Sequence, residues 1–314
     1  KWDAGTQVVL ERFDGYWGKQ PQIKKAVYLW RNESAVRAAM VLLGEADLTP
    51  NISRQDATRP DMDSSYLNAD TSYLRIQTEA PPLNDRRVRM ALNYAVDLGA
   101  IRGTIVSKDM VPATQLIVPN IFGYNPDLKV WPHDPQKARQ LLAEARKDGV
   151  PVDREILLLD RQGLYPGSGE LMEAVMTMYK AAGLNVKLKV LERGVLRTYE
   201  NKPYPSGPYI VHKTHDNNKG DAVFTCYFKY HSSGVQSSTN DREVDELIEK
   251  AQAAMGEKRK SLWQAAFKRI QEEVIPDVVL FHMVGYARVG KRISFTPSIT
   301  TKSELPLAQI TFKQ

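Results

Sequence analysis

The sequence predicts an α/β protein built from more than one part, and three observations support this prediction. The chain has 314 residues, more than a single hydrophobic core usually holds, so two lobes or one large α/β unit are expected. Residues 155–191 follow the order strand, helix, strand, as in a β-α-β unit. Elsewhere, strand-like runs lead into helices that open with capping residues.

The chain begins with two predicted strands, Val8–Arg12 and Lys25–Arg31, which are rich in β-prone residues. A helix follows from Ser34, and Gly44 occupies the position where a left-handed cap ends many helices. Residues 50–72 contain prolines, serines and aspartates without a clear period. We therefore expect this stretch to be mostly loop.

A strand is predicted at Tyr73–Thr78. It is followed by Asn84 and Asp85, which can cap the next helix. A second helix start is predicted at Asp134 and Pro135, where the Asp134 carboxylate can cap the helix and Pro135 occupies the first helical position. Two amphipathic helices are therefore predicted here.

The β-α-β unit consists of strand Glu155–Leu159, helix Glu170–Ala182 and strand Val186–Leu191. If the strands are parallel neighbours, the crossover should be right-handed and the loops should gather at the strand carboxyl ends, where ligands commonly bind. Loop 160–169 is therefore a candidate for ligand contact.

Residues 201–239 predict a long surface segment around one short strand, Tyr209–His212. Helices at Val244–Met255 and Lys258–Val274 and a last strand at Val278–Val284 complete the prediction.

Composition narrows the class of protein. Hydrophobic residues make up 42% and charged residues 25% of the chain, as in globular proteins. No run approaches the roughly 18 apolar residues of a membrane helix. The single Cys226 excludes an intrachain disulfide and a Cys-based zinc site, and we expect it to be buried. The net charge of +6 is spread among acids, which argues against nucleic-acid binding.

Several motifs resemble the family of dipeptide, oligopeptide and nickel solute-binding proteins of ABC transporters, extracellular solute-binding family 5. They occur in the family's order along the whole chain, at 13–18, 82–97, 123–126, 134–145, 182–186 and 241–248. The resemblance implies a periplasmic-binding-protein-like two-lobe fold of type II, peptide-binder subclass. Family members carry a further amino-terminal segment, so we expect a carboxy-terminal portion with an incomplete first lobe.

By the family's architecture, residues 1–75 and 281–314 would be the remnant of lobe I, and residues 76–280 would form lobe II. The strands near Tyr73–Thr78 and Val278–Val284 would then be hinge crossings.

The resemblance also implies a function. The chain would be the substrate-binding component of an ABC importer, a periplasmic or otherwise extracytoplasmic, membrane-associated monomer. It would capture a peptide or peptide-like solute between two lobes and deliver it to the permease transmembrane subunits. A non-peptide cargo such as an opine, an oligosaccharide or a nickel chelate is the alternative within this class, and a peptide hydrolase is the alternative outside it.

Asp221 occupies the position at which peptide-binding relatives often carry an acid that pairs with a peptide ammonium group, and an Asp after Gly is also an ordinary turn residue. The chain departs from the family pattern at Lys219, and Lys213 adds positive charge nearby. These positive charges disfavour simple recognition of a free amine.

Arg161 and Tyr165 follow the strand at 155–159, in a loop that relatives place beside the ligand, where Arg can bind a carboxylate. A solvated Arg is the alternative. Phe224 and Tyr227 belong to a dense aromatic run that either walls a pocket or fills a core as alternate residues of a strand. We expect one or two of these rings to line the site.

His215 and Asp216 are further ligand-contact candidates within the pattern His212-x-x-His215-Asp216. We expect these residues on a surface loop and predict no metal site. The sequence has no Walker loop and no dinucleotide-binding glycine motif, so no cofactor is expected. Ser168-Gly169 lacks the form of a nucleophile turn, is better interpreted as a helix N-cap, and predicts no enzyme.

Overall fold

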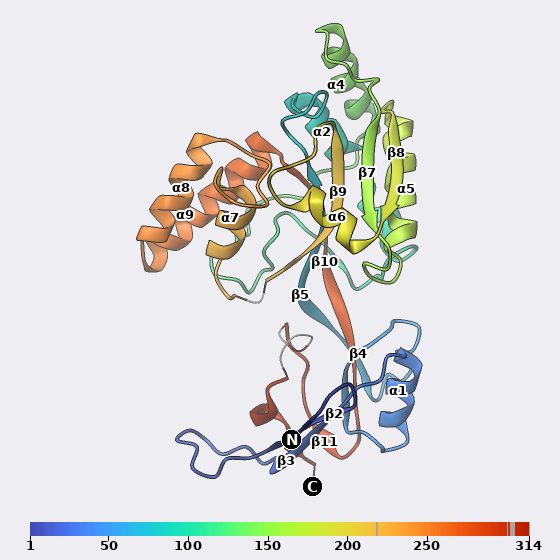
Figure 1. Ribbon diagram of the computed structural model, residues 1–314, viewed down its shortest axis with the longest axis vertical. Coiled ribbons are helices and arrows are strands. Elements are labelled where there is room, and N and C mark those ends of the chain that lie inside the picture. Colours follow the sequence, from blue (N-terminus) through green and yellow to red (C-terminus); the bar gives the residue numbers. More distant parts are fainter. Residues whose placement is uncertain (218, 300, 302–304, 314) are drawn as a thin grey trace. The chain divides into compact units, whose positions relative to one another are not determined.

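A computed structural model describes residues 1–217, 219–299, 301 and 305–313. Contacts within it divide the chain into two compact units (Figure 1): unit 1 contains Lys1–Ala69 and Val284–Gln314, and unit 2 contains Asp70–Met283. Both boundaries fall inside strands, β5 (Asp63–Ile76) and β10 (Asp277–Val289). These are the strands predicted as crossings, although the boundary in β5 precedes Tyr73. Their role as hinges stays a prediction.

Unit 1 is built on short antiparallel strands. A three-stranded sheet forms first, and β4 pairs with the carboxyl-terminal part of β10. Helix α1 buries Ala38 and Val41 and is followed by Gly44 at φ 78°, as predicted. The elements are β1 (Trp2–Asp3), β2 (Gln7–Glu11), β3 (Lys25–Leu29), α1 (Ser34–Leu42), β4 (Leu48–Ile52), β11 (Ile293–Ser294), the 3₁₀ turn η2 (Leu307–Gln309) and β12 (Thr311–Phe312).

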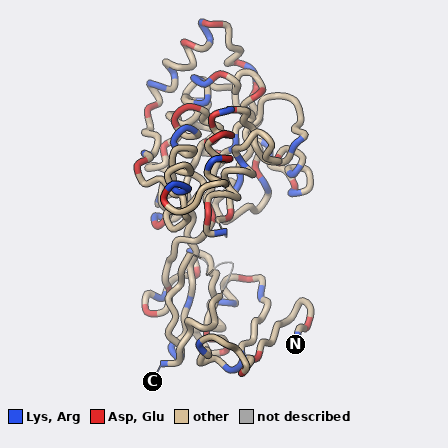
Figure 2. Tube along the Cα trace, turned by 90° about the vertical axis from the view of Figure 1, so that its left-hand side faces the viewer, with Lys and Arg blue, Asp and Glu red and all other residues tan. Residues whose placement is uncertain are grey.

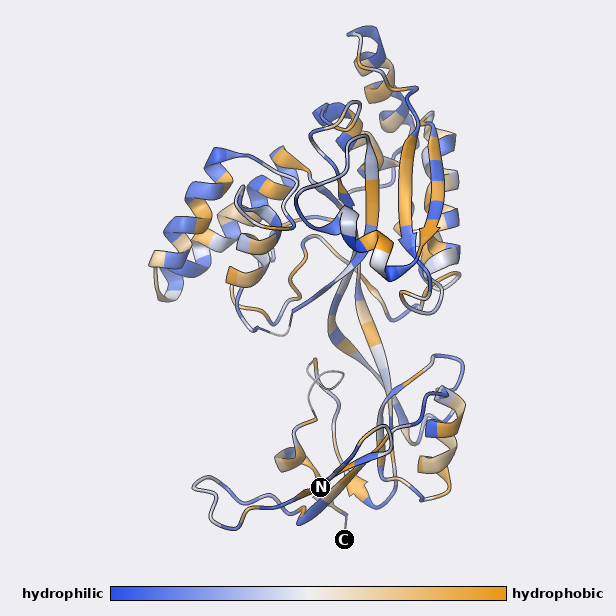
Figure 3. Cartoon of the chain, viewed as in Figure 1, coloured by the Kyte–Doolittle hydropathy of each residue, from blue (hydrophilic) through white to orange (hydrophobic). Residues whose placement is uncertain are grey.

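Unit 2 contains a mixed sheet with the order β10-β5-β9-β7-β8, and the short β6 (Val111–Pro112) also pairs with β10. Strand β7 (Ile156–Arg161) lies parallel to β8 (Val186–Leu191) and to β9 (Tyr209–Asp216), whereas β5 is antiparallel to β9. The predicted β-α-β unit is therefore confirmed. Figure 3 shows β7 as largely apolar, as expected for a strand inside a sheet covered by helices, whereas β9 is apolar only in its first part.

Helices cover the sheet of unit 2, with α4 and α5 on one side of Figure 1 and α7 to α9 on the other. Asp85 caps α2 and Asp134 caps α4 with Pro135 in its first turn, both as predicted. The helices are α2 (Arg86–Ala95), α3 (Leu98–Ile101), α4 (Pro135–Lys147), α5 (Ser168–Ala182), α6 (Arg193–Glu200), α7 (Val223–Tyr230), α8 (Arg242–Ala253) and α9 (Gly256–Arg269), which continues as the π-helical turn η1 (Ile270–Val274).

The structure corrects the prediction for residues 50–72. This stretch contains the end of β4 and more than half of β5, which starts at Asp63. Thr71 and Ser72 are buried although they are polar, because this part of β5 is paired with β9 and lies between β10 and β9. Tertiary pairing thus overrides the weak local preference of these residues.

The prediction for residues 201–239 is also corrected. Strand β9 extends to Asp216 and is mostly buried, so the His212-x-x-His215-Asp216 pattern lies on a strand and not on a surface loop. The aromatic run after it is helix α7, which buries Thr225, Cys226, Lys229 and Tyr230. That spacing is helical, and the β-prone residue types concealed it. Cys226 is buried, as predicted.

Two smaller corrections concern loop 160–169. Arg161 is the last residue of β7 and not a loop residue, since the strand runs two residues further than predicted. The residue that caps α5 is Gly167 in a left-handed conformation, and Ser168 already belongs to the helix. Tyr165 lies in the loop, as predicted.

No helix in the described part of the chain is long and apolar enough to span a bilayer. Lys and Arg alternate with Asp and Glu along the trace (Figure 2), so no single basic stripe forms in the view shown.

Candidate functional site

The candidate site is the end of the unit 2 sheet at which strands β7 and β9 terminate, which we call the polar edge. Because β7 and β9 are parallel, Arg161 and Asp216 end their strands at the same edge. Strand β5 is antiparallel to β9 and pairs Asp70 with Asp216, so the unit 2 part of β5 begins there too. The carboxyl ends of parallel strands are a common place for ligands. This polar edge therefore brings together three segments that are distant in sequence.

Four side chains form a hydrogen-bonded cluster just inside the polar edge. Asp160 Oδ1 lies 2.8 Å from His212 Nδ1, and His212 Nε2 lies 3.0 Å from Ser72 Oγ. The Tyr165 hydroxyl lies 2.8 Å from Ser72 Oγ and 3.1 Å from His212 Nε2. Ser72, Asp160 and His212 are each 1% exposed. Burial raises the pKa of Tyr165, so its hydroxyl stays protonated and able to donate.

Ser72, His212 and Asp160 are connected in the way that a nucleophile, a general base and the acid that orients the base are connected in a catalytic triad. A substrate cannot reach Ser72 Oγ in this arrangement, because the residue is 1% exposed and its hydroxyl also bonds Tyr165. The geometry instead fixes the Tyr165 ring, which stands nearly perpendicular to the His212 ring at 79°. The cluster thus holds loop 160–169 in place at the polar edge.

His215 is buried on the other face of β9. Its Nε2 lies 2.7 Å from Thr225 Oγ1 of α7, and its ring is stacked with Phe224 at 6.3 Å. Burial, then the nearby Lys229 and Lys213, lower the pKa of His215 well below its usual value. A neutral His215 therefore joins α7 to the sheet.

Asp221 is engaged within the protein. Its carboxylate accepts hydrogen bonds from Arg259 Nη2 at 2.9 Å and Nε at 3.0 Å, and from the backbone N–H of Val223 at 2.7 Å. These bonds fix the start of α7. A ligand ammonium would have to share the carboxylate with Arg259, so the predicted role of Asp221 stays a prediction with a competing partner.

Arg161 and the aromatic residues of α7 are more accessible. Among the described residues, no carboxylate pairs with the half-buried Arg161. Phe224 and Tyr227 are each 40% exposed. Phe224 stacks on Phe228 at 5.1 Å, and Tyr227 stacks on His231 at 4.8 Å. Exposed, pre-positioned rings are suited to contact with a ligand.

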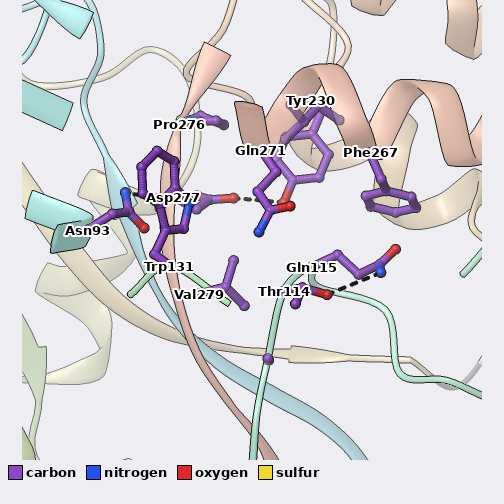
Figure 4. Close-up of a pocket in the computed structure, with 12 residues that line it drawn as sticks. Asn93, Thr114, Gln115, Trp131, Tyr230, Phe267, Gln271, Pro276, Asp277 and Val279 are labelled. Atoms are coloured by element: carbon purple, nitrogen blue, oxygen red, sulfur yellow. Dashed lines mark hydrogen bonds between the residues drawn. The ribbon is translucent and has the colours of Figure 1, made fainter. Parts of the chain in front are cut away.

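A small, partly open cavity lies elsewhere in unit 2, between α2, α9 and β10 (Figure 4). Its volume is about 20 Å³, enough for one water molecule. Asn93, Trp131 and Asp277 lie on one side of it and Gln115 and Phe267 on the other. The cavity is too small for a solute and belongs to the core.

Ser72, Asp160 and His212 were missed as site residues by sequence reasoning. His212 was noticed only as part of a pattern assigned to the surface, and Asp160 adjoins the predicted Arg161. A run of three polar residues, Asp70–Ser72, inside a strand was the one available signal. No group of three or more potential metal ligands occurs within residues 1–217, 219–299, 301 and 305–313.

Comparison with known proteins gives a consistent result. A family model described as bacterial extracellular solute-binding proteins, family 5 Middle, matches residues 1–231. The dipeptide-binding protein of Escherichia coli (strain K12) is 26% identical over 304 residues, which cover 93% of this chain and 56% of that protein. Heme-binding protein A of Haemophilus influenzae is 26% identical, with 93% and 54% covered.

Solved structures agree on the fold. The ABC transporter substrate-binding protein CtaP from Listeria monocytogenes has a TM-score of 0.85 at 18% identity, covering 100% of this chain and 65% of that one. The oligopeptide-binding protein AppA from Bacillus subtilis, in complex with a nonapeptide, has a TM-score of 0.74 at 18% identity, with 100% and 65% covered. The chain spans a little over half the length of the curated relatives just described.

Proposed function

Because the chain belongs to family 5 of the bacterial extracellular solute-binding proteins, we propose that it is part of the substrate-binding component of an ABC importer. In this proposal it captures a peptide or peptide-like solute outside the cytoplasm, works as a monomer, and hands the solute unaltered to permease subunits. Similar proteins are named for dipeptides, for di- and tripeptides and for glutathione. These names support a peptide cargo, whereas heme-binding protein A, which is similar over the same share of this chain, is named for a non-peptide ligand.

The observation that carries the proposal is the polar edge of unit 2. The buried cluster fixes Tyr165 in the loop that follows Arg161, the last residue of β7, and Arg161 has no carboxylate partner in the described part of the chain. A guanidinium binds a carboxylate through two charge-assisted hydrogen bonds. Phe224 and Tyr227 offer exposed rings for apolar side chains. A peptide presents both groups, a terminal carboxylate and side chains.

The proposal is tested by calorimetric titration of the full chain with a library of short peptides, after native mass spectrometry for a co-purified molecule. Arg161→Ala should weaken binding at least tenfold, about 1.4 kcal/mol. Arg139→Ala is the matched control, since Arg139 is an exposed residue of α4. Binding to no peptide, or equal binding by both variants, would contradict the proposal. Binding of an opine, an oligosaccharide or nickel-histidine alone would replace the peptide by that cargo.

A peptide hydrolase is the second candidate, and the Ser72–His212–Asp160 connectivity is the observation that favours it. The burial of Ser72 counts against it. Incubation of the chain with the same peptides, followed by mass spectrometry, separates the two functions. Intact peptides are expected. Cleavage that is lost in Ser72→Ala would establish the hydrolase.

A further inference from the structure

Three basic side chains are buried together in unit 2, on the face of the sheet that α7 covers. Arg75 is 2% exposed, Lys213 is 5% exposed and Lys229 is 9% exposed. Lys213 lies directly opposite Tyr73 in the β5–β9 pair, and Arg75 lies two residues further along the same face of β5. Lys229 comes from α7 and places its Nζ 5.9 Å from the centroid of the Tyr73 ring. We call these three residues the cation cluster.

The carboxylates near the cation cluster leave it incompletely paired. Asp277 Oδ2 accepts a hydrogen bond of 2.7 Å from Tyr230 (Figure 4), and Glu200 Oε1 lies 3.7 Å from Lys213 Nζ. Within the described residues, neither Arg75 nor Lys229 takes part in an ion pair. Buried charges in proteins are normally paired with opposite charges. Among the residues described, three buried basic groups thus lie near two carboxylates, one fewer than full pairing would need.

Neutral oxygens are its hydrogen-bond acceptors. Gln236 Oε1 accepts from Lys213 Nζ at 3.0 Å and also from Lys229 Nζ. Arg75 donates to the backbone carbonyls of Tyr199 and Gln236. In the described part of the chain, the buried Arg75 Nε and Tyr73 hydroxyl have no hydrogen-bond partner. Two donors, one on Arg75 itself and one on the neighbouring Tyr73, are thus without an acceptor among these described residues.

Burial and mutual repulsion already act on the lysines. The pKa of Lys229 is lowered to about 8, first by burial and then by Arg75. The pKa of Lys213 is lowered well below its usual value, first by burial and then by Lys229. An anion among these groups would relieve the repulsion and favour both ammonium forms.

One aromatic ring, Tyr204, lies over Arg75 of the cation cluster and also lines an open pocket. The Tyr204 ring centroid lies 4.4 Å from Arg75 Cζ, and Tyr204 also lines an open pocket of about 740 Å³ together with Gln77 and residues 202–207. We infer that displacement of this ring, which would also break the 3.1 Å hydrogen bond from the Tyr204 hydroxyl to the Ser237 carbonyl, would open Arg75 to the pocket. The pocket and the cation cluster both belong to unit 2.

We propose that Arg75, Lys213 and Lys229 form a binding site for a small anion with carboxylate or phosphate oxygens. The anion would accept hydrogen bonds from the two ammonium groups in place of Gln236 and from Arg75 Nε and the Tyr73 hydroxyl. The site is separate from the polar edge of unit 2 and does not depend on the cargo proposed above.

Calorimetric titration of the full chain tests this site, with inorganic phosphate and with succinate as the two probes and sodium chloride at equal ionic strength as reference. Wild-type protein should bind at least one probe, and the probe that binds identifies phosphate or carboxylate as the ligand oxygen. Lys229→Met should weaken binding at least tenfold. Lys187→Met removes an exposed lysine of β8 and should bind as wild type.

Gln236→Glu provides an independent variant, because it places a carboxylate where the two ammonium groups converge. This variant should melt at a higher temperature than wild type without any probe and should no longer bind phosphate or succinate. It decides the question if Lys229→Met does not fold. Absence of binding by wild type, or unchanged binding by Gln236→Glu, overturns the proposal.

Discussion

The substitution Asp160→Ala tests the buried cluster at the polar edge most directly. The Asp160 and His212 side chains are 2% and 0% exposed and their atoms approach to 2.8 Å. Removing the carboxylate leaves His212 Nδ1 buried without its partner. Loss of one member of a buried, charge-assisted pair costs about 3 kcal/mol. For a unit of this size each kcal/mol lowers the melting temperature by roughly 2–4 °C, so a drop of roughly 6–12 °C is expected.

The assay is thermal unfolding followed by circular dichroism, with Asp153→Ala as matched control. Asp153 Oδ1 lies 2.7 Å from Arg146 Nη2, a distance similar to that of the buried pair, but its side chain is 79% exposed. Because water screens exposed pairs, the control should melt close to wild type. If Asp160→Ala melted no lower than Asp153→Ala, burial would not be the source of the energy and our interpretation of the cluster would be refuted.

Three further predictions concern the core of unit 2. Burial raises the pKa of Asp277 from 3.8 to about 6, so between these pH values the folded state binds more protons than the unfolded state. The free energy of unfolding should therefore fall by about 3 kcal/mol as pH rises from 4 through 6. Urea titrations at several pH values should show a weaker dependence of this free energy on pH for Asp277→Asn than for wild type. The buried Tyr179 hydroxyl has no partner among the described residues, so Tyr179→Phe should leave the urea midpoint unchanged or slightly raised, and a loss above about 1 kcal/mol would contradict this. Gly123 has φ +100°, and an added Cβ would lie 2.8 Å from Trp263 Cβ. Gly123→Ala should therefore lower the free energy of unfolding by about 2 kcal/mol in the same assay. Gly169→Ala is the control and should be nearly neutral, because no atom of the described residues lies within 4 Å of the added Cβ.

Local sequence signals predicted those parts of the fold that depend on neighbouring residues. Asp85 and Asp134 cap helices because their carboxylates reach backbone N–H groups two and three residues ahead, an interaction that the local sequence contains in full. The β-α-β unit was predictable for the same reason, since apolar periods and the Gly183 stop mark its elements.

The site was only partly predictable. Tyr165 was predicted as a site residue, yet its partners Ser72 and His212 come from β5 and β9, and their meeting depends on the register of two strands distant in the chain. A shift of one residue in that register would turn His212 to the opposite face. For Asp221, a local motif suggested a carboxylate that is free to bind a ligand. In the structure this carboxylate accepts hydrogen bonds from Arg259 of α9, which lies far from it in the sequence.

The sequence by itself determined the family, the α/β class, the helix starts and the burial of Cys226. Only the tertiary structure decided that residues 63–72 form a strand whose polar end, Asp70–Ser72, is paired with β9, that the aromatic run is a helix, and that three basic side chains share one buried face. The physical reason is that capping and periodicity act over a few residues. Burial and the pairing of polar groups depend on which distant segments become neighbours.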